Sequence, residues 1–169
     1  MDYQEIAREL SSNKIIFRQL LSGIDEEMFL WRPRPEKWCL LEIVCHLYDE
    51  EREDFRARTK QVLENPALKL PQIDPQGWVK SRNYIEQDYQ TRLHDFLEER
   101  TQSVQWIHNL SDPEWNNAYD HPKFGKMTAW MFLSNWLAHD YLHIRQIVKL
   151  KFEYLRQKTR EELTYAGTW

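Results

Sequence analysis

The sequence predicts an all-α fold, a four-helix bundle with long connecting loops, formed by one domain that spans residues 1–169. Three observations predict it. Four long segments carry apolar residues at helical spacing, no segment alternates cleanly as a half-buried strand does, and glycine occurs only four times. A chain of this length buries roughly 70% of its unfolded surface in one core. We expect that core in about residues 2–150, with residues 151–169 as a C-terminal extension that either prolongs the last helix or docks separately.

The first two helices are separated by a connector rich in proline. Apolar residues recur at helical spacing from about Asp2 to Leu21, which predicts the first helix. The connector Trp31–Trp38 contains two prolines, which disfavour helix and stiffen the chain. The second helix is expected from about Cys39 to Asn65, because Pro66 then ends it.

The other two helices are expected from about Ser81 to Asn109 and from near Met127 to at least Leu150. The loops before them contain proline and glycine and run to about 15 residues, which is long for a minimal bundle. They either reach across the bundle or cover a site at one of its ends.

The composition excludes several classes of function. The net charge is −4, and the 23 Lys and Arg are interspersed with 27 Asp and Glu, so we expect no nucleic-acid partner. No apolar run approaches the length of a membrane span and no secretion signal is visible, so we expect no membrane partner and a cytoplasmic location. Neither a G-x-G-x-x-G motif nor a P-loop occurs.

The two cysteines and eight tryptophans belong to structure rather than chemistry in this prediction. Cys39 and Cys45 lie six residues apart on one expected helix, a rise of about 9 Å, which is too far for a disulfide and predicts reduced thiols. Indole rings bury large areas, so most of the tryptophans are expected in the core or in pocket walls; they are Trp31, Trp38, Trp78, Trp106, Trp115, Trp130, Trp136 and Trp169.

An H-x-x-x-H pair, His139 and His143, is the strongest chemical signal. Residues four apart stack on one face of a helix, and two imidazoles held in this way can bind one transition-metal ion. Both histidines fall on the apolar stripe of the fourth helix, so they point into the bundle. Two ordinary hydrogen-bonded core histidines are the alternative.

His46 strengthens the metal interpretation because it replaces an apolar residue on the inward stripe of the second helix. A buried imidazole without partners costs several kcal/mol, and one shared metal ion is an economical explanation for three such histidines. His46, His139 and His143 therefore form a candidate His₃ site, a known zinc ligand set that leaves one position open. The remaining histidines, His94, His108 and His121, show no such arrangement.

Two acids near these histidines have competing interpretations. Glu50 follows His46 by one turn and is a candidate fourth ligand or water-orienting base. Its alternative is a solvated acid in the run Asp49–Asp54, where the helix register could slip by one residue. Asp140 points about 100° away from His139 and could hydrogen-bond elsewhere, although a surface acid is the preferred interpretation.

Two segments together resemble the DinB/YfiT-like superfamily. The segment Lys37–Glu50, with His46, is similar to the signature of that family's second helix, and His139–Ile147 is similar to its fourth-helix motif. The run His121–Thr128 is also similar to the approach to that helix, and the resemblance covers about Leu20 to Leu150. One departure is that Cys39 stands where the family often has Ser, which with Glu42 would form a capping box.

The resemblance implies a four-helix bundle, often a homodimer, with a divalent metal held by His46, His139 and His143. It also implies small-molecule substrates. Family members with assigned activities include S-transferases and isomerases that use low-molecular-weight thiols such as bacillithiol or mycothiol, and many others are described only as metal-dependent hydrolases.

Three functions follow as hypotheses. The first is a metal-dependent transferase in which the ion lowers the pKa of a low-molecular-weight thiol. The second is a small-molecule hydrolase that activates water, with Glu50 as a possible base; a peptidase is not expected, because Asp140 stands where the H-E-x-x-H motif has Glu. The third is a non-catalytic metal- or ligand-binding protein. Zinc and nickel are the expected ions, and iron and manganese are also compatible with three imidazoles.

Overall fold

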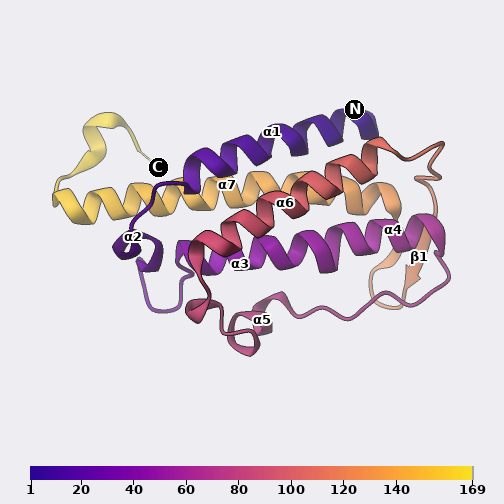
Figure 1. Ribbon diagram of the computed structural model, residues 1–169, viewed down its shortest axis with the longest axis horizontal. Coiled ribbons are helices and arrows are strands. Elements are labelled where there is room, and N and C mark those ends of the chain that lie inside the picture. Colours follow the sequence, from indigo (N-terminus) through magenta and orange to yellow (C-terminus); the bar gives the residue numbers. More distant parts are fainter. Residues whose placement is uncertain (169) are drawn as a thin grey trace.

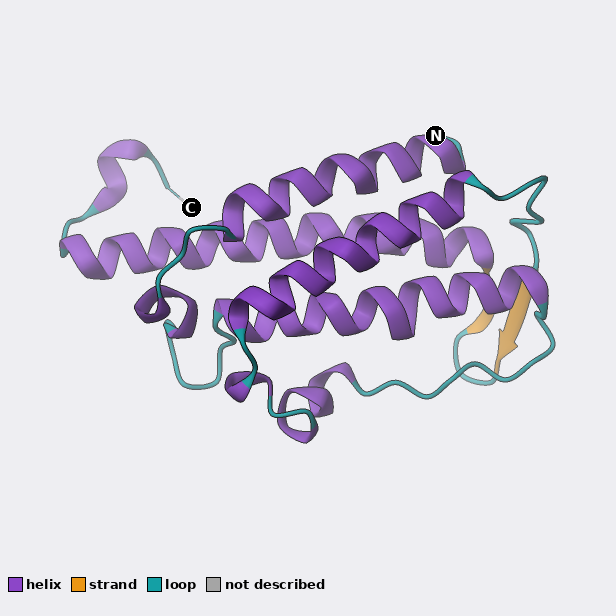
Figure 2. Cartoon of the chain, in the orientation of Figure 1, coloured by secondary structure: helices purple, strands orange, loops and turns teal. Residues whose placement is uncertain are grey.

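The computed structural model describes residues 1–168, and helices make up most of them (Figure 2). The predicted all-α four-helix bundle is confirmed. We call the four long helical units of the bundle rods. The second rod consists of three consecutive segments: α3 (Leu40–Asp49), a π-helical stretch (Glu50–Arg56) and α4 (Ala57–Glu64). The other three rods are α1 (Tyr3–Leu21), α6 (Tyr89–His108) and α7 (Ala129–Thr159).

The rods are not arranged in chain order. The main packing partners of α1 are α6 and α7, while α3 packs on α6 and α4 packs on α7. Figure 1 shows α1 and α7 running in one direction and the other two rods in the opposite direction. The chain after α4 therefore has to return along the whole bundle before α6 can begin. This explains the long connector of residues 65–88, which runs the length of the bundle, whereas the loop between α6 and α7 joins these helices at one end.

Most helix starts have a side-chain cap. Asp2, Asp88 and Thr128 each accept a hydrogen bond from a backbone N–H in the first turn of α1, α6 and α7. At the start of α3, Glu42 accepts the backbone N–H of Cys39 at 2.9 Å, as the glutamate of a capping box does. A thiol is a weaker acceptor than a hydroxyl, so the reciprocal half of this box contributes less.

The predicted start of the third rod was wrong, and two short helices occur that were not predicted. The third rod begins at Tyr89 rather than Ser81, because the chain first forms α5 (Pro75–Ser81), passes through Asn83 with φ of 46° and makes a 3₁₀ turn (Tyr84–Glu86). A short helix α2 (Glu26–Leu30), capped by Asp25, lies between α1 and the proline-rich connector. Both short helices are below the length at which hydrophobic periodicity is visible.

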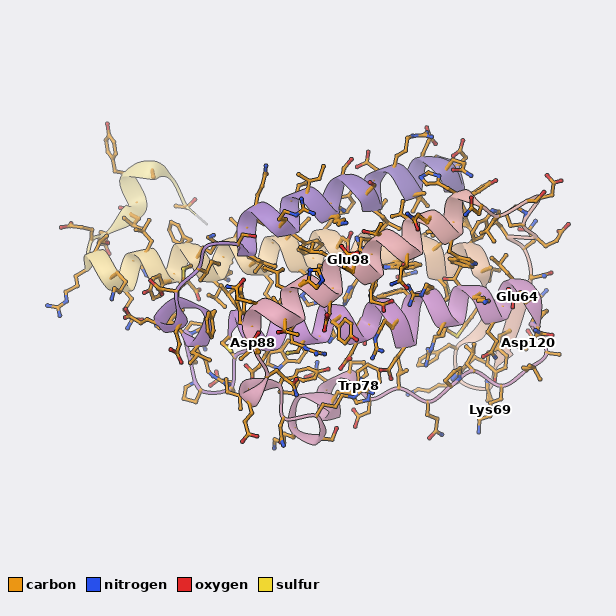
Figure 3. All side chains as sticks on the ribbon, in the orientation of Figure 1. Glu64, Lys69, Trp78, Asp88, Glu98 and Asp120 are labelled. Carbon is orange, nitrogen blue, oxygen red and sulfur yellow. The ribbon has the colours of Figure 1, made fainter. Side chains whose placement is uncertain are left out.

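A two-stranded antiparallel hairpin also occurs where no strand was expected. Its strands are β1 (Ala118–His121) and β2 (Gly125–Thr128), and the tight turn uses Gly125 with φ of 70°. The strands are four residues long, and their residues are half-buried or exposed without a regular alternation. Figure 3 shows Asp120 and Glu64 at the same end of the bundle, where the hairpin lies beside α4.

The C-terminal extension prolongs the last helix. α7 continues past Leu150 to Thr159, and Arg160, with φ of 58°, ends it before a 3₁₀ turn (Leu163–Ala166). In Figure 1 this part of α7 projects beyond the ends of the other rods. Trp169 lies outside the described residues.

The core consists of two main hydrophobic clusters separated by a polar layer. One cluster includes Phe17, Phe96 and Ile147, and the other includes Leu10, Ile107 and Trp136. Between them every rod contributes a buried polar or charged side chain to a layer, which we call the polar layer: Asn13, His46, Glu50, Glu51, Arg100, Asp140 and His143. Burying polar groups costs free energy unless they find hydrogen-bond partners, so the residues of the polar layer are candidates for function.

The tryptophans and cysteines largely agree with the prediction. Trp136 is fully buried, and the other described tryptophans are half-buried against the two main clusters. Cys39 and Cys45 are both free and buried. Across the described residues, none of the helices has the length and apolar character needed to span a bilayer.

Candidate metal centre

Three imidazoles from two rods converge in the polar layer. His46 comes from α3, and His139 and His143 lie one turn apart on α7. The Nε2 atom of His139 lies 3.2 Å from that of His46 and 3.0 Å from that of His143. All three rings offer a nitrogen within 4.8 Å of the others. The structure thus brings together the three residues that the sequence singled out.

Two aromatic rings pack against these histidines. The Trp38 ring lies 4.9 Å from the His46 ring, and the Phe55 ring lies 4.9 Å from the His139 ring. Burial lowers the pKa of His46 to about 3, of His139 to about 2 and of His143 to about 4. The neighbouring His143 ring lowers the pKa of the other two further. All three imidazoles are therefore neutral at physiological pH, as metal ligands must be.

The convergence fits a divalent ion better than a hydrogen-bonded cluster. A neutral Nε2 carries one proton or one lone pair, so the His139 Nε2 makes at most one good hydrogen bond, yet it has two close nitrogen neighbours. Protonating a ring would supply a donor, but the lowered pKa values oppose it. Nitrogen ligands at about 2.1 Å from a tetrahedral ion lie roughly 3.4 Å apart, close to the observed separations.

The outer nitrogens of two of these rings lack hydrogen-bond partners among the described residues. The Nδ1 atoms of His46 and His143 are buried, and no described side chain hydrogen-bonds to them. In most metal sites this nitrogen donates to a carboxylate or carbonyl that orients the ring. Here contact with Trp38 and with the other two histidines holds the His46 ring instead.

Glu50 lies at the start of the π-helical stretch, where the wider turn changes the register of the rod. The interpretation of Glu50 as a solvated acid was wrong, because its side chain is buried. Burial raises the pKa of its carboxyl group, and Asp54 raises it further. Its oxygens are not among the atoms that converge with the three histidine nitrogens. Phe55, from the same stretch, is the residue that contacts His139.

Asp140 is not a surface acid, and that preferred interpretation was also wrong. It is fully buried, and Arg100 of α6 donates to both of its carboxylate oxygens, at 2.6 and 2.7 Å. Arg100 also donates twice to Glu51, at 2.9 Å each. The N–H groups of Asn13 and Trp136 donate to Asp140 and Glu51, so the surplus negative charge has additional donors. All four rods meet in this ion cluster.

The other histidines lie outside the site. His94 and His108 are exposed on α6, as expected. His121 belongs to the hairpin, where its Nδ1 accepts the backbone N–H groups of Lys123 and Phe124 at 3.0 and 3.1 Å.

Two residues of the ion cluster, Asn13 and Arg100, were missed, although the sequence carries a signal for them. Asn13 follows Ile6 and Leu10 on the inward stripe of α1, and Arg100 follows Leu93 and Leu97 on that of α6. The spacing test that found His46 would also have found these two polar residues. What no spacing test shows is that they meet each other.

Comparisons with known proteins place the fold. A solved structure from Bacillus subtilis superposes with a TM-score of 0.78 at 17% identity, covering 95% of this chain and 89% of that one. It is described as YfiT, a probable metal-dependent hydrolase with an unusual four-helix bundle topology. At this identity the likeness establishes the fold alone. The comparison with curated proteins found no match.

A family profile shows which protein family the chain belongs to. The profile of the DinB superfamily matches residues 12–147, which include all three converging histidines and most of the four rods. The match agrees with the resemblance seen in the sequence motifs. The chain belongs to the DinB superfamily.

Proposed function

We propose that this protein is a divalent-metal-dependent enzyme that acts on a small molecule, with His46, His139 and His143 as the metal ligands. The observation that carries the proposal is the convergence of three neutral imidazoles from two rods, of which His46 and His143 are buried and His139 is half-buried. When bound, a divalent ion supplies Lewis acidity that lowers the pKa of a thiol or water placed beside it. Zinc or nickel is the ion we expect, and iron or manganese also suits three imidazoles.

The favoured reaction is transfer of a low-molecular-weight thiol to an electrophile. The converging group contains imidazoles and no carboxylate among the described residues, so the protein ligands leave the charge of the ion uncompensated. Such a site favours an anionic partner such as a thiolate. The thiol loses its proton to solvent, its sulfur forms a bond to carbon, and the leaving group departs with the electron pair of the bond that breaks. Trp38 covers part of the His46 ring and Phe55 covers part of the His139 ring.

The second candidate is hydrolysis of a small molecule. The description of the matching Bacillus subtilis structure as a probable metal-dependent hydrolase supports it. Glu50 would be the base in this case, acting across at least one intervening water, because its oxygens do not join the converging nitrogens.

Elemental analysis tests the metal site. Protein purified without a His tag and without added metal should contain about one equivalent of a transition metal, and His46→Ala and His143→Ala should contain almost none. His94→Ala, which removes an exposed histidine of α6, is the matched control and should retain the metal. Equal metal content in all four proteins would refute the site.

Activity assays then separate the two reactions. Metal-loaded protein is incubated with an electrophile and a panel of low-molecular-weight thiols, and in parallel with ester and amide substrates. Thiol adduct formation that His143→Ala abolishes would support the transferase, and ester or amide turnover above the metal-free control would support the hydrolase. Full metal content without either activity would identify a non-catalytic metal-binding protein.

A cytoplasmic location and a homodimer complete the proposal. Both rest on the sequence features and the family resemblance described above. Light scattering on the purified protein would test the homodimer.

A further inference from the structure

A pocket of about 500 Å³ lies between the proline-rich connector and the C-terminal half of α7. Its connector wall includes Trp31 and Trp38, and its helical wall continues along the part of α7 that projects beyond the other rods. The volume is typical of a small-molecule site. The pocket also gives the C-terminal extension a role, because Glu153, Arg156 and Gln157 belong to its lining.

The charge of this pocket is opposite in sign to that of the protein. The whole chain carries −4, yet four cationic side chains line the pocket, namely Arg34, Lys37, Lys149 and Arg156. Among the described residues that line it, Glu153 is the single carboxylate. None of the four cations forms an ion pair with another described residue. An excess of unpaired positive charge around a concave surface attracts anions.

The pocket shares two residues with the surroundings of the metal centre. Trp38 lines it and also lies against the His46 ring. Gln146 lines it and lies near His143, where its side chain partly opposes the lowering of the His143 pKa by burial. Along a helix that rises 1.5 Å per residue, Lys149 lies about 9 Å and Arg156 about 20 Å beyond His143. On α7 the cations therefore begin about 1.7 turns beyond His143.

Contacts with α3 and α7 hold the connector wall of the pocket in place. Arg32 forms an ion pair with the buried Glu42 at 3.1 Å, and the Trp31 ring packs edge-on against Tyr154 of α7 at 5.5 Å. Arg32 is thus used structurally, whereas the nearby Arg34 and Lys37 remain available to a ligand. Trp31 and Trp38 add apolar surface that suits a flat or hydrophobic group.

From these observations we propose that the pocket binds the anionic part of the substrate, so that the substrate is an anionic small molecule with an apolar or aromatic portion. A carboxylate, sulfonate or phosphate meets Lys37 and Lys149, and the apolar portion lies on the two tryptophans. The reacting atom then lies toward Trp38 and Gln146, the end of the pocket nearest the metal centre. This inference rests on the proposed function only in assigning the ligand as substrate; the anion site itself is independent of the metal.

Calorimetry on the full-length chain tests the proposal with two aromatic probes of opposite charge, indole-3-acetate and tryptamine. The wild type should bind indole-3-acetate at least about tenfold more tightly than tryptamine. Lys37→Gln/Lys149→Gln should weaken indole-3-acetate binding by about fivefold, and raising the salt concentration should weaken it in the wild type. Lys80→Gln/Lys126→Gln removes the same charge from exposed lysines elsewhere and should leave binding unchanged.

Repeating the titration with His46→Ala, whose metal content is measured on the same sample, separates the two proposals. Charge-selective binding that persists in this variant supports the pocket whether or not the wild type holds a metal. If the metal is present but the two probes bind equally, the anion pocket is refuted and the metal site stands. If His46→Ala abolishes binding while Lys37→Gln/Lys149→Gln does not affect it, the carboxylate binds the metal itself, and the pocket proposal is overturned.

Discussion

Arg100 of α6 and Asp140 of α7 form a buried, bidentate ion pair, with N···O distances of 2.6 and 2.7 Å. These helices occupy opposite corners of the bundle, since each packs mainly against α1 and against the second rod. The pair therefore crosses the polar layer and connects the helix that carries two candidate ligands to its diagonal neighbour. Asp140 directly follows His139 in the chain, so the ion pair also fixes the rotation of α7 at the metal centre.

We expect Asp140→Ala to lower the free energy of unfolding by about 3 kcal/mol, because it leaves part of a buried guanidinium without a counter-charge. Urea denaturation at constant metal concentration measures the change. Asp95→Ala is the control, since Asp95 pairs with Arg92 at 3.0 Å on the half-exposed face of α6 and should cost less than about 1 kcal/mol. Equal losses in the two variants would mean that the buried pair contributes no special stability.

Glu50→Gln should change how stability depends on pH. Burial raises the pKa of the Glu50 carboxyl above its ordinary value of 4.5, so the folded protein holds this proton more tightly than the unfolded chain does. As the pH rises above that value, the unfolded chain loses its proton first, and the stabilisation present at low pH is lost. Between about pH 5 and 8 the wild type should lose more than about 1 kcal/mol relative to Glu50→Gln.

Thermal unfolding of both proteins across this range provides the measurement. Glu98→Gln, at an exposed position of α6, controls for the change in net charge. A difference between wild type and Glu50→Gln that stays constant with pH would show that Glu50 is ionised normally in the folded state.

Removing the metal should leave the bundle folded. Two hydrophobic clusters flank the polar layer and do not depend on the ion, so we expect the helical circular-dichroism signal to persist after chelation. The melting temperature should fall by several degrees, as mass action requires for a ligand that binds the folded state. Loss of helical signal on chelation at room temperature would instead identify a structural metal.

Both cysteine thiols should resist modification in the native protein. Burial raises the pKa of Cys39 to about 11 and that of Cys45 to about 12, and both side chains are inaccessible. At pH 8 an aromatic disulfide reagent should react with fewer than about 0.2 thiols per chain, and with both thiols once denaturant is added. Rapid labelling of either cysteine in native protein would contradict the packing around the start of α3.

The sequence by itself determined the four rods, the absence of a disulfide and the inward direction of the three histidines. Each of these depends on the spacing of residues within one helix, and spacing within a helix is fixed by its 3.6-residue turn. His46 could be identified in this way because it interrupts an apolar stripe. The shared ligand set followed from the cost of burying several imidazoles and from the family resemblance.

Only the tertiary structure decided which inward polar residues meet. The sequence shows that Asp140 points away from His139, but its burial depends on Arg100 arriving from the opposite corner of the bundle. The π-helical stretch that buries both Glu50 and Glu51 and the pocket between the connector and α7 depend equally on packing between rods. The order and direction of the rods depend on the paths of long connectors, and the spacing of residues within a helix does not determine these paths. The neighbours of each buried charge therefore cannot be predicted from that spacing.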